Sequence, residues 1–314
     1  MWFLNKPKAA LCFIISYDHV LQQEELWREW IEPNMDILNI YFHCKLSDAV
    51  KTPFVSKYTI PSEFTAETTY ADVTPAYMAS MFYARSHDVN NQWFCMLTDS
   101  CVPILSPLAF RKLFLAHYGK SIIRVRAPYW NIYKHTRGNL NKLPKHLQLT
   151  NDPWFIFSRY HVNLTERFLS SFHKVYNIIN GGGIANESLF AIVLQTYNQV
   201  NHPKTHLNEV STIADWSRMA SATSPFMFKN KEVMKEMHII QKLMQQTPEA
   251  MFLRKVHFSF PKESLKLLWK MERTKDKEKE KEQQQEKETQ MVFWGIFGCC
   301  GCCLGILVYF SLFV

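Results

Sequence analysis

The chain has 314 residues, of which 47% are hydrophobic and 14% aromatic, so it can bury one large core or two small ones. Its nine glycines argue against a repeat or low-complexity protein. The formal net charge is +8, and residues 272–290 carry six basic and seven acidic side chains, so the rest of the chain carries +9. Such a charge suits an anionic ligand or a membrane surface. No basic run with interleaved aromatics occurs, so we expect no nucleic-acid partner.

Apolar, β-rich runs alternate with runs of helical periodicity over the first 271 residues. Strands are predicted at 10–16, 37–43, 93–97, 121–125 and 154–157, and helices at 21–30, 75–85, 107–117, 164–178 and 229–246. This alternation predicts an α/β fold with a mixed, mainly parallel sheet that is flanked by helices. In open sheets of this kind, ligands bind at the carboxyl ends of the strands.

The C-terminal part of the chain separates into two segments. Residues 272–290 consist almost entirely of Lys, Glu and Gln, often with opposite charges four residues apart, which predicts a solvated helical stalk. Residues 291–314 contain no charge and are long enough to span a bilayer as a helix. We therefore expect a domain at 1–271, a stalk at 272–290 and a single-pass C-terminal anchor at 291–314, with the domain in the cytosol.

The cysteines fall into two groups. Those in the body are scattered through strand-like segments and are expected to be small buried hydrophobes: Cys12, Cys44, Cys95 and Cys101. The others lie in the predicted anchor, where palmitoylation and close helix packing are both compatible with the sequence: Cys299, Cys300, Cys302 and Cys303.

Glu187 is the first candidate for a catalytic residue. It follows the triple glycine Gly181–Gly183 and lies at the predicted start of a helix. A flexible loop there could position the carboxylate to take a proton from an incoming hydroxyl. The alternative is structural, because an acid in the first turn complements the helix dipole, with Asn186 as the N-cap. The residues alone leave both alternatives open.

Polar and basic side chains flank two other predicted strands. Asp99 and Ser100 follow the strand at 93–97, where a ligand-contacting loop would lie, although a turn before Pro103 also explains them. Arg254 and Lys255 lie between apolar residues and could neutralise a diphosphate, with a solvated edge as the alternative. No Asp-x-Asp occurs in the chain, so we expect no metal site and assign the neutralising role to basic side chains.

Trp216 is the candidate for contact with a sugar. It lies in the segment Asp215-Trp-Ser-Arg218 and could stack on a sugar ring, although most tryptophans simply belong to the core. A Cys/His or Ser/His/Asp hydrolase is not supported, because neither Cys95 nor Cys101 has a glycine-rich turn around it. The histidines do not show metal-ligand spacing.

Over residues 10–258, these segments resemble the core-2/I-branching glycosyltransferases, which include β-1,6-N-acetylglucosaminyltransferases and xylosyltransferases. The similar segments follow one another in the family's order: 13–17, 39–43, 70–84, 94–104, 154–159, Asn186-Glu-Ser-Leu-Phe190, Trp216 and Phe252-Leu-Arg-Lys255. The resemblance implies a GT-A-like fold and a metal-independent enzyme without a cofactor. Such an enzyme would transfer a sugar with inversion from a UDP-sugar to a hydroxyl of a glycan, protein or lipid.

The resemblance also implies a role for each candidate residue. Glu187 would be the general base, and Trp216 would contact the acceptor. Lys255 would bind the donor diphosphate, and Arg254, Asp99 and Ser100 would lie on the donor side. N-acetylglucosamine is the first expectation for the donor sugar, with xylose second.

Several positions depart from the family pattern. A second phosphate-binding basic residue is expected shortly after Trp216, but the matching segment is Ser224-Pro-Phe-Met-Phe228, which leaves Lys229, Lys231 or Arg254 as substitutes. The residue before the base is Asn186, where the family has aspartate, and a C-terminal anchor replaces the usual N-terminal one. These departures support two hypotheses. One is a cytosol-facing enzyme, as a viral member would be, and the other is a tail-anchored protein that keeps the fold for binding or scaffolding without turnover.

Overall fold

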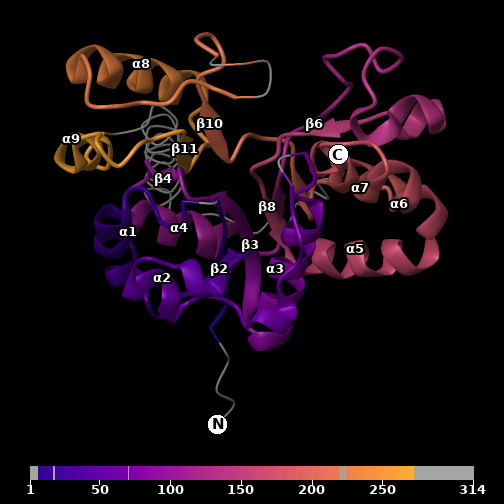
Figure 1. Ribbon diagram of the computed structural model, residues 1–314, viewed down its shortest axis with the longest axis horizontal. Coiled ribbons are helices and arrows are strands. Elements are labelled where there is room, and N and C mark those ends of the chain that lie inside the picture. The colour runs from indigo at the N-terminus through magenta and orange to yellow at the C-terminus, as the bar shows by residue number, and fades with distance from the viewer. Residues whose placement is uncertain (1–5, 17, 70, 220, 222–223, 272–314) are drawn as a thin grey trace, which may run out of the picture. The chain divides into compact units, whose positions relative to one another are not determined.

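The computed structural model describes residues 6–16, 18–69, 71–219, 221 and 224–271. Its central sheet (Figure 1) has six strands, in the spatial order β2 (Leu38–Cys44), β1 (Lys8–Ile15), β3 (Asn91–Thr98), β8 (Ile156–Ser158), β5 (Ser121–Ile122) and β9 (His206–Leu207). β1 is parallel to β2 and β3, β8 is antiparallel to β3 and β5, and β5 is parallel to β9. The mixed, mainly parallel sheet predicted from the sequence is therefore confirmed.

Helices cover both faces of this sheet. The helices that contribute to the core on one face are α3 (Thr74–His87), α5 (Arg159–Ser171), α6 (His173–Asn180) and α7 (Leu189–Thr196). Those on the other face are α1 (Glu24–Ile31), α2 (Pro53–Lys57) and α4 (Pro107–His117). Within β1, Ala10 and Cys12 join the first core and Leu11 and Phe13 the second, because successive side chains of a strand point to opposite faces.

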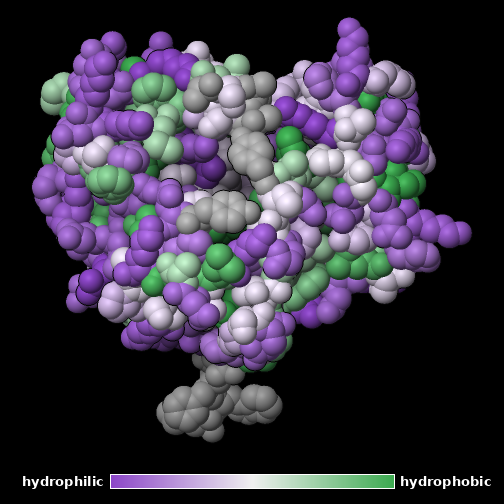
Figure 2. All heavy atoms as spheres, in the orientation of Figure 1, coloured by the Kyte–Doolittle hydropathy of each residue, from purple (hydrophilic) through white to green (hydrophobic). Residues whose placement is uncertain are grey.

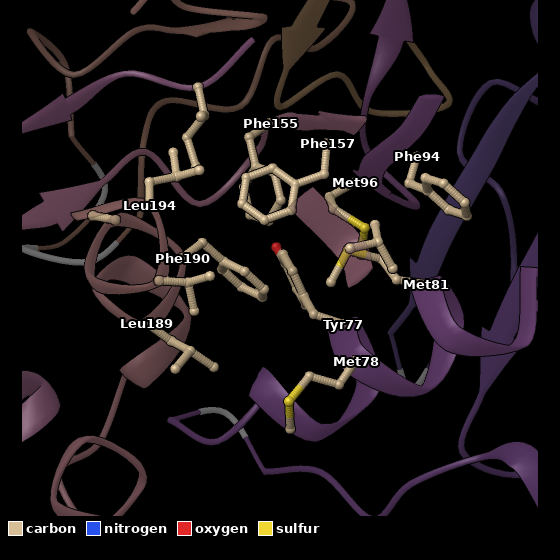
Figure 3. Close-up of a cluster of buried hydrophobic side chains, with 14 of the residues drawn as sticks. Tyr77, Met78, Met81, Phe94, Met96, Phe155, Phe157, Leu189, Phe190 and Leu194 are labelled. Carbon is tan, nitrogen blue, oxygen red and sulfur yellow. The ribbon is translucent and has the colours of Figure 1, made fainter. Parts of the chain in front are cut away.

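Aromatic and methionine side chains from α3, β3, β8 and α7 fill the first core, as Figure 3 shows. The rings of Phe155 and Phe190 lie 4.6 Å apart, and Tyr77 of α3 lies 6.2 Å from Phe190. Every residue of α7 from Leu189 to Leu194 is fully buried. Since burying one such side chain contributes roughly 1.5–3 kcal/mol, α7 and the turn before it are held firmly in place.

A smaller sheet of three strands contains β10 (Thr212–Ala214), β11 (Phe252–Arg254) and β4 (Val102–Pro103). β11 is parallel to β10 and antiparallel to β4, and α8 (Val233–Gln246) and α9 (Lys262–Leu268) pack around it in a third core. The N–H of Val256 donates to the carbonyl of Ser100 at 2.9 Å. This contact brings the end of β11 to the carboxyl end of β3.

Shorter elements complete the described fold. β6 (Val125–Arg126) and β7 (Thr150–Asn151) form an antiparallel pair. The 3-10 helices are η1 (Glu32–Asn34), η2 (Ser47–Ala49), η3 (Ser62–Phe64), η4 (Arg137–Lys142), η5 (Lys145–Leu147) and η6 (Ala185–Glu187). The last of these contains the candidate base.

Two predicted elements are each divided in the structure. The strand predicted at 121–125 becomes β5 and β6, because β5 pairs with β8 and β9 whereas β6 pairs with β7. The helix predicted at 164–178 becomes α5 and α6, with a break at Phe172. The backbone of Phe172 leaves the helical region (φ −124°, ψ 35°) while its ring packs on Phe168 at 5.4 Å.

None of the helices in the described ranges is both long enough and apolar enough to cross a membrane. The predicted stalk at 272–290 and the predicted anchor at 291–314 lie outside the described residues. The face of the molecule in Figure 2 is covered largely by hydrophilic side chains, with hydrophobic ones scattered among them.

The body cysteines Cys12, Cys44, Cys95 and Cys101 are buried, as predicted, and the structure shows that they are free. Burial raises the pKa of each of these thiols. Since the thiolate is the nucleophilic form, none of the four is suited to nucleophilic catalysis.

Candidate active site

Two adjoining cavities share part of their walls. The first, which we call the strand-end cavity, has a volume of about 400 Å³ and is lined by residues at the carboxyl ends of β1 and β3. The second, which we call the Trp216 cavity, has a volume of about 490 Å³. Pro153, Trp154 and Glu187 line both cavities. Glu187 therefore lies where the two cavities meet.

The predicted site residues lie together around this junction. Five of them line the strand-end cavity: Glu187, Lys255, Arg254, Asp99 and Ser100. Trp216 lines the other cavity, which is named after it. The structure thus places the predicted donor-side and acceptor-side residues in separate cavities, on either side of the predicted base.

Glu187 ends η6, and only Ser188 separates it from α7. Ser188 is the N-cap residue of α7 and makes no side-chain capping bond, so Asn186 is not the helix cap considered above. Asn186 is buried, and its Oδ1 has no hydrogen-bond partner among the described residues. The cap role considered for Asn186 is therefore wrong, and Glu187 lies in the turn before α7 and not in the first turn of that helix.

The triple glycine before this turn is closely packed, which differs from the flexible loop expected from the sequence. A Cβ atom on Gly182 would lie 2.3 Å from the carbonyl oxygen of Thr136 and 2.4 Å from the backbone nitrogen of Asn139. Gly138 donates its N–H to the carbonyl of Gly182 at 2.9 Å. Only glycine permits this approach of two backbones. The contact fixes the turn at 136–139 beside the segment that bears Glu187.

Arg137 belongs to that turn and faces Glu187. Its Nη1 lies 3.6 Å from Oε2 of Glu187, and each of the two side chains is 18% exposed. The guanidinium carbon lies 5.1 Å from the ring centroid of Trp130, and Nη1 donates to the Tyr129 hydroxyl at 3.4 Å. Arg137 was not among the residues predicted from the sequence. The glycine next to it, Gly138, has a φ of 58° in the structure and so marks a tight turn, but a glycine in the sequence does not reveal the contact with Glu187.

The environment of Glu187 sets its protonation near neutral pH. Burial raises the pKa of Glu187 to about 7, while the charge of Arg137 opposes this effect. Asp152 adds to the increase and Arg126 reduces it. A carboxylate whose pKa is close to the operating pH is well suited to accept a proton from a hydroxyl.

Arg254 and Lys255 give the strand-end cavity a cationic wall. The guanidinium carbon of Arg254 lies 4.6 Å from the ring centroid of Trp154. Its Nε and Nη1 are buried and have no hydrogen-bond partner among the described residues. Lys255 donates to Oγ of Ser224 at 2.8 Å, and burial together with the Arg254 charge lowers its pKa. Buried donors without partners are costly, so an anion is the expected complement.

Asp99 and Ser100 join the parts of the cavity wall. The Asp99 carboxylate accepts the N–H of Ser16 at 3.2 Å, and the Ser100 carbonyl accepts the N–H of Val256. These bonds tie the ends of β1 and β11 to the loop after β3. A turn role is therefore present, and the residues line the cavity as well.

Trp216 is 41% exposed and stacks against Trp154, with 6.3 Å between the ring centroids and 18° between the planes. The ring of Trp154 also makes the cation–π contact with Arg254. One buried tryptophan thus links the cationic wall of the first cavity to the exposed aromatic face of the second.

Three basic residues could replace the second phosphate-binding residue, and their positions in the structure distinguish them. Arg254 lines the strand-end cavity, whereas Lys229 and Lys231 are not part of its described wall. Arg218, which follows Trp216 closely, forms ion pairs with Asp215 at 2.6 Å and Glu236 at 2.8 Å. It therefore stabilises the fold around β10 and α8.

The Trp216 cavity contains a charged group that was not predicted from the sequence. Arg124 and Arg126 line it, and both form ion pairs with Asp152, at 3.0 and 3.1 Å. The available signal was the pair of arginines two residues apart at the end of a predicted strand. Within the described ranges, no group of three or more His, Cys, Asp or Glu side chains is arranged to hold a metal ion.

The family model described as Core-2/I-Branching enzyme matches residues 11–241, a range that includes Glu187 and Trp216 but not Arg254 or Lys255. No curated protein matches the chain. Among solved structures, the chain is similar to 4-diphosphocytidyl-2C-methyl-D-erythritol synthase from Anaerococcus prevotii DSM 20548, at 12% identity and a TM-score of 0.30. The similarity covers 61% of this chain and 99% of that one.

Proposed function

Because the chain belongs to the Core-2/I-Branching enzyme family, which is a family of glycosyltransferases, we propose that it transfers a sugar from a UDP-sugar to an acceptor hydroxyl with inversion. The observation that carries this proposal is the position of Glu187, a carboxylate on the walls of both cavities. One cavity has a cationic wall and the other an exposed tryptophan. A base at their junction can reach an acceptor hydroxyl beside the donor's anomeric carbon.

The donor binds in the strand-end cavity, with its diphosphate against Arg254 and Lys255. The unsatisfied Nε and Nη1 of Arg254 support this assignment, since a guanidinium presents parallel donors to phosphate oxygens. The position of the cavity also supports it, because nucleotides bind at the carboxyl ends of strands in open α/β sheets. Arg254 thereby takes the place of the second phosphate-binding residue that the sequence lacks after Trp216.

The acceptor enters from the Trp216 cavity, where Trp216 offers an aromatic face to a sugar ring. Glu187 removes the proton of the acceptor hydroxyl as its oxygen attacks the anomeric carbon. The bond between that carbon and the diphosphate oxygen breaks on the opposite face, so the configuration inverts. The pKa of Glu187, near 7, supports this role at neutral pH.

The charge that develops on the leaving UDP is stabilised by Arg254 and Lys255 in place of a metal ion. The absence of Asp-x-Asp from the sequence supports this metal-independent step. Removing one such preorganised electrostatic contact typically costs on the order of 3 kcal/mol of transition-state stabilisation. N-acetylglucosamine is the proposed donor sugar, with xylose second, from the membership of the family.

The test measures UDP release by the purified full-length chain with a panel of UDP-sugars, with and without a chelator. We expect chelator-insensitive release with one donor and its loss in Glu187→Gln, by roughly 100- to 10,000-fold for a general base. Glu166→Gln is the control, because Glu166 is 57% exposed, pairs with Arg85 and lines neither cavity. Saturable UDP binding without release from any donor would favour a fold kept for binding, and absence of binding would refute the proposal.

We also propose that residues 291–314 anchor the chain in a membrane, which their charge-free composition supports, and that the domain lies in the cytosol. Protease treatment of intact microsomes tests this topology. Digestion of the domain is expected, and its protection would refute the cytosolic orientation.

A further inference from the structure

The Trp216 cavity holds a charged group that the proposed transfer step does not use. Arg124 and Arg126 line this cavity and share a single carboxylate, that of Asp152. The two arginine side chains are 41% and 40% exposed, whereas Asp152 is 13% exposed. One largely buried acid therefore compensates two guanidiniums that remain accessible from the cavity.

The two arginines keep donors available for a ligand. Nη2 of Arg124 and Nη2 of Arg126 both donate to Oδ1 of Asp152, at 3.2 and 3.1 Å. In the described part of the chain, neither Nη1 group donates a hydrogen bond to a protein atom. A guanidinium has five N–H donors in a planar fork that matches the oxygens of a carboxylate or sulfate. Because the two guanidiniums share one carboxylate, N–H donors remain for a second anion.

The other charges around the cavity do not cancel this excess. Glu187 is the other acid on the described wall, and it faces Arg137 at 3.6 Å, so its charge is compensated when it ionises. Counting Arg137 with the two arginines of the wall, three guanidiniums face two carboxylates, which leaves an excess of one positive charge. An acidic group on the ligand would complement it, and the contact would be charge-assisted on both sides.

The same cavity presents aromatic faces. Trp216 is 41% exposed and Tyr129 is 63% exposed, and both line the cavity beside the arginines. Flat aromatic surfaces suit the apolar face of a sugar ring better than they suit an isolated phosphate or an extended acidic peptide. On the basis of the transfer reaction proposed above, we infer that the acceptor is an acidic saccharide. Arg124 and Arg126 bind its carboxylate or sulfate, and Trp216 stacks on its ring.

The test compares binding of the purified full-length chain to matched pairs of immobilised glycans, each neutral glycan beside its sialylated, uronic-acid or sulfated counterpart. We expect binding to the acidic members, and the separate carboxylated and sulfated pairs show which group is recognised. Arg126→Gln should weaken this binding roughly tenfold, as for the loss of one charge-assisted hydrogen bond. Arg111→Gln is the matched control, because Arg111 forms the same kind of paired contact with Asp36, at 2.7 and 2.6 Å, outside both cavities.

In Arg126→Gln, Asp152 keeps only Arg124 as a partner, so weaker binding could also result from a loss of folding. A second variant separates these two explanations. Asp152→Asn removes the competing carboxylate and should strengthen binding of the acidic glycans. A preference for neutral glycans or the absence of glycan binding would overturn the inference. Acidic binding that both variants leave unchanged would also overturn it.

UDP binding and UDP release are measured on the same preparations. UDP binding without a preference for acidic glycans refutes the acidic acceptor alone. Failure of the wild-type chain to bind UDP refutes the proposed function and, with it, the proposal that the acceptor is an acidic saccharide. The two failures are therefore distinguishable.

Discussion

The guanidinium of Arg137 lies 3.6 Å from the carboxylate of Glu187, and both side chains are mostly buried. Burial raises the pKa of Glu187 to about 7, and the positive charge of Arg137 limits that increase. Arg137 therefore helps to set the lowest pH at which the proposed base is ionised. It is a positioning residue, which acts through Glu187 and the turn that bears it.

Substitution of Arg137 by Gln should raise the pKa of Glu187, because the largest effect that opposes burial is removed. The acid limb of the profile of kcat/KM against pH should move to higher pH. Activity at pH 6 should fall by up to about tenfold, the effect of a shift of one pKa unit. Activity at pH 9 should change much less. The measurement is UDP release between pH 5 and 9.

Arg137→Lys keeps the positive charge and should restore much of the wild-type pH profile. If Arg137→Gln instead lost activity because it unfolded, retention of the charge alone would not explain the recovery. Arg111→Gln serves as the control for loss of a surface arginine. An Arg137→Gln enzyme whose acid limb coincides with that of the wild type would show that Arg137 does not influence the base.

Substitution of Glu187 by Gln should stabilise the fold at high pH while it removes activity. The pKa of Glu187 rises from 4.5 to about 7 on folding, so the native state favours the protonated acid. The stability that this provides is complete below the unfolded pKa and is lost as pH rises through 7. Glutamine resembles the protonated acid and does not ionise. The expected gain above pH 8 is about 3 kcal/mol, from 1.36 kcal/mol per pKa unit.

Urea unfolding of wild type and Glu187→Gln at pH 4 and pH 8.5 measures this difference. The two proteins should have similar midpoints at pH 4, and the variant should be the more stable one at pH 8.5. A variant that is less stable at both values would show that the Glu187 carboxylate is held by favourable contacts, against the burial argument.

Substitution of Gly182 by Ala should reduce both stability and activity. The new Cβ would meet the Thr136 carbonyl oxygen at 2.3 Å and the Asn139 nitrogen at 2.4 Å, so one backbone segment must move. Overpacking of this kind costs about 1–3 kcal/mol and would displace the turn that carries Arg137. Gly119→Ala is the matched control, because a Cβ there meets no atom of the described residues within 4 Å. Thermal unfolding and UDP release are measured on both; equal behaviour of the two variants would contradict the packing role.

Elements defined by local signals were predictable from the sequence. The helix predicted at 107–117 coincides with α4, because Ser106 caps it by accepting the N–H of Ala109 at 3.2 Å and Pro107 occupies its first turn. The run at 121–125 has the right composition for a strand, but its two halves pair with different partners. Pairing between distant segments decides that division, and no local pattern reports it.

The candidate site shows the same limit. Glu187, Arg254 and Lys255 could be selected because order along the chain and charge in apolar context single them out. Arg137 could not, since its contact with Glu187 depends on a turn packed against Gly182 from another part of the chain. The triple glycine indicates a special backbone, but the sequence does not say whether it provides flexibility or close approach. Arg124, Arg126 and Asp152 likewise meet only in the folded chain.

Substitution of Arg254 by Ala should weaken UDP binding by roughly ten- to a hundredfold, the usual effect of losing a hydrogen bond to a charged group. Arg254→Lys should recover little of this loss, because lysine lacks the planar fork and the stacking on Trp154. Lys229→Ala is the control, since Lys229 does not belong to the described wall of the strand-end cavity. Isothermal titration of each protein with UDP gives the affinities.

Thermal unfolding of the same variants separates binding from folding. Nε and Nη1 of Arg254 are buried without a partner in the described part of the chain, so they contribute no hydrogen bond to the free protein. Arg254→Ala should therefore unfold near the wild-type temperature in the absence of UDP, and UDP should raise that temperature less than it does for wild type. An unchanged UDP affinity would remove Arg254 from the donor site. A large loss of stability with normal affinity would instead assign it to the fold, as a cation held by the ring of Trp154.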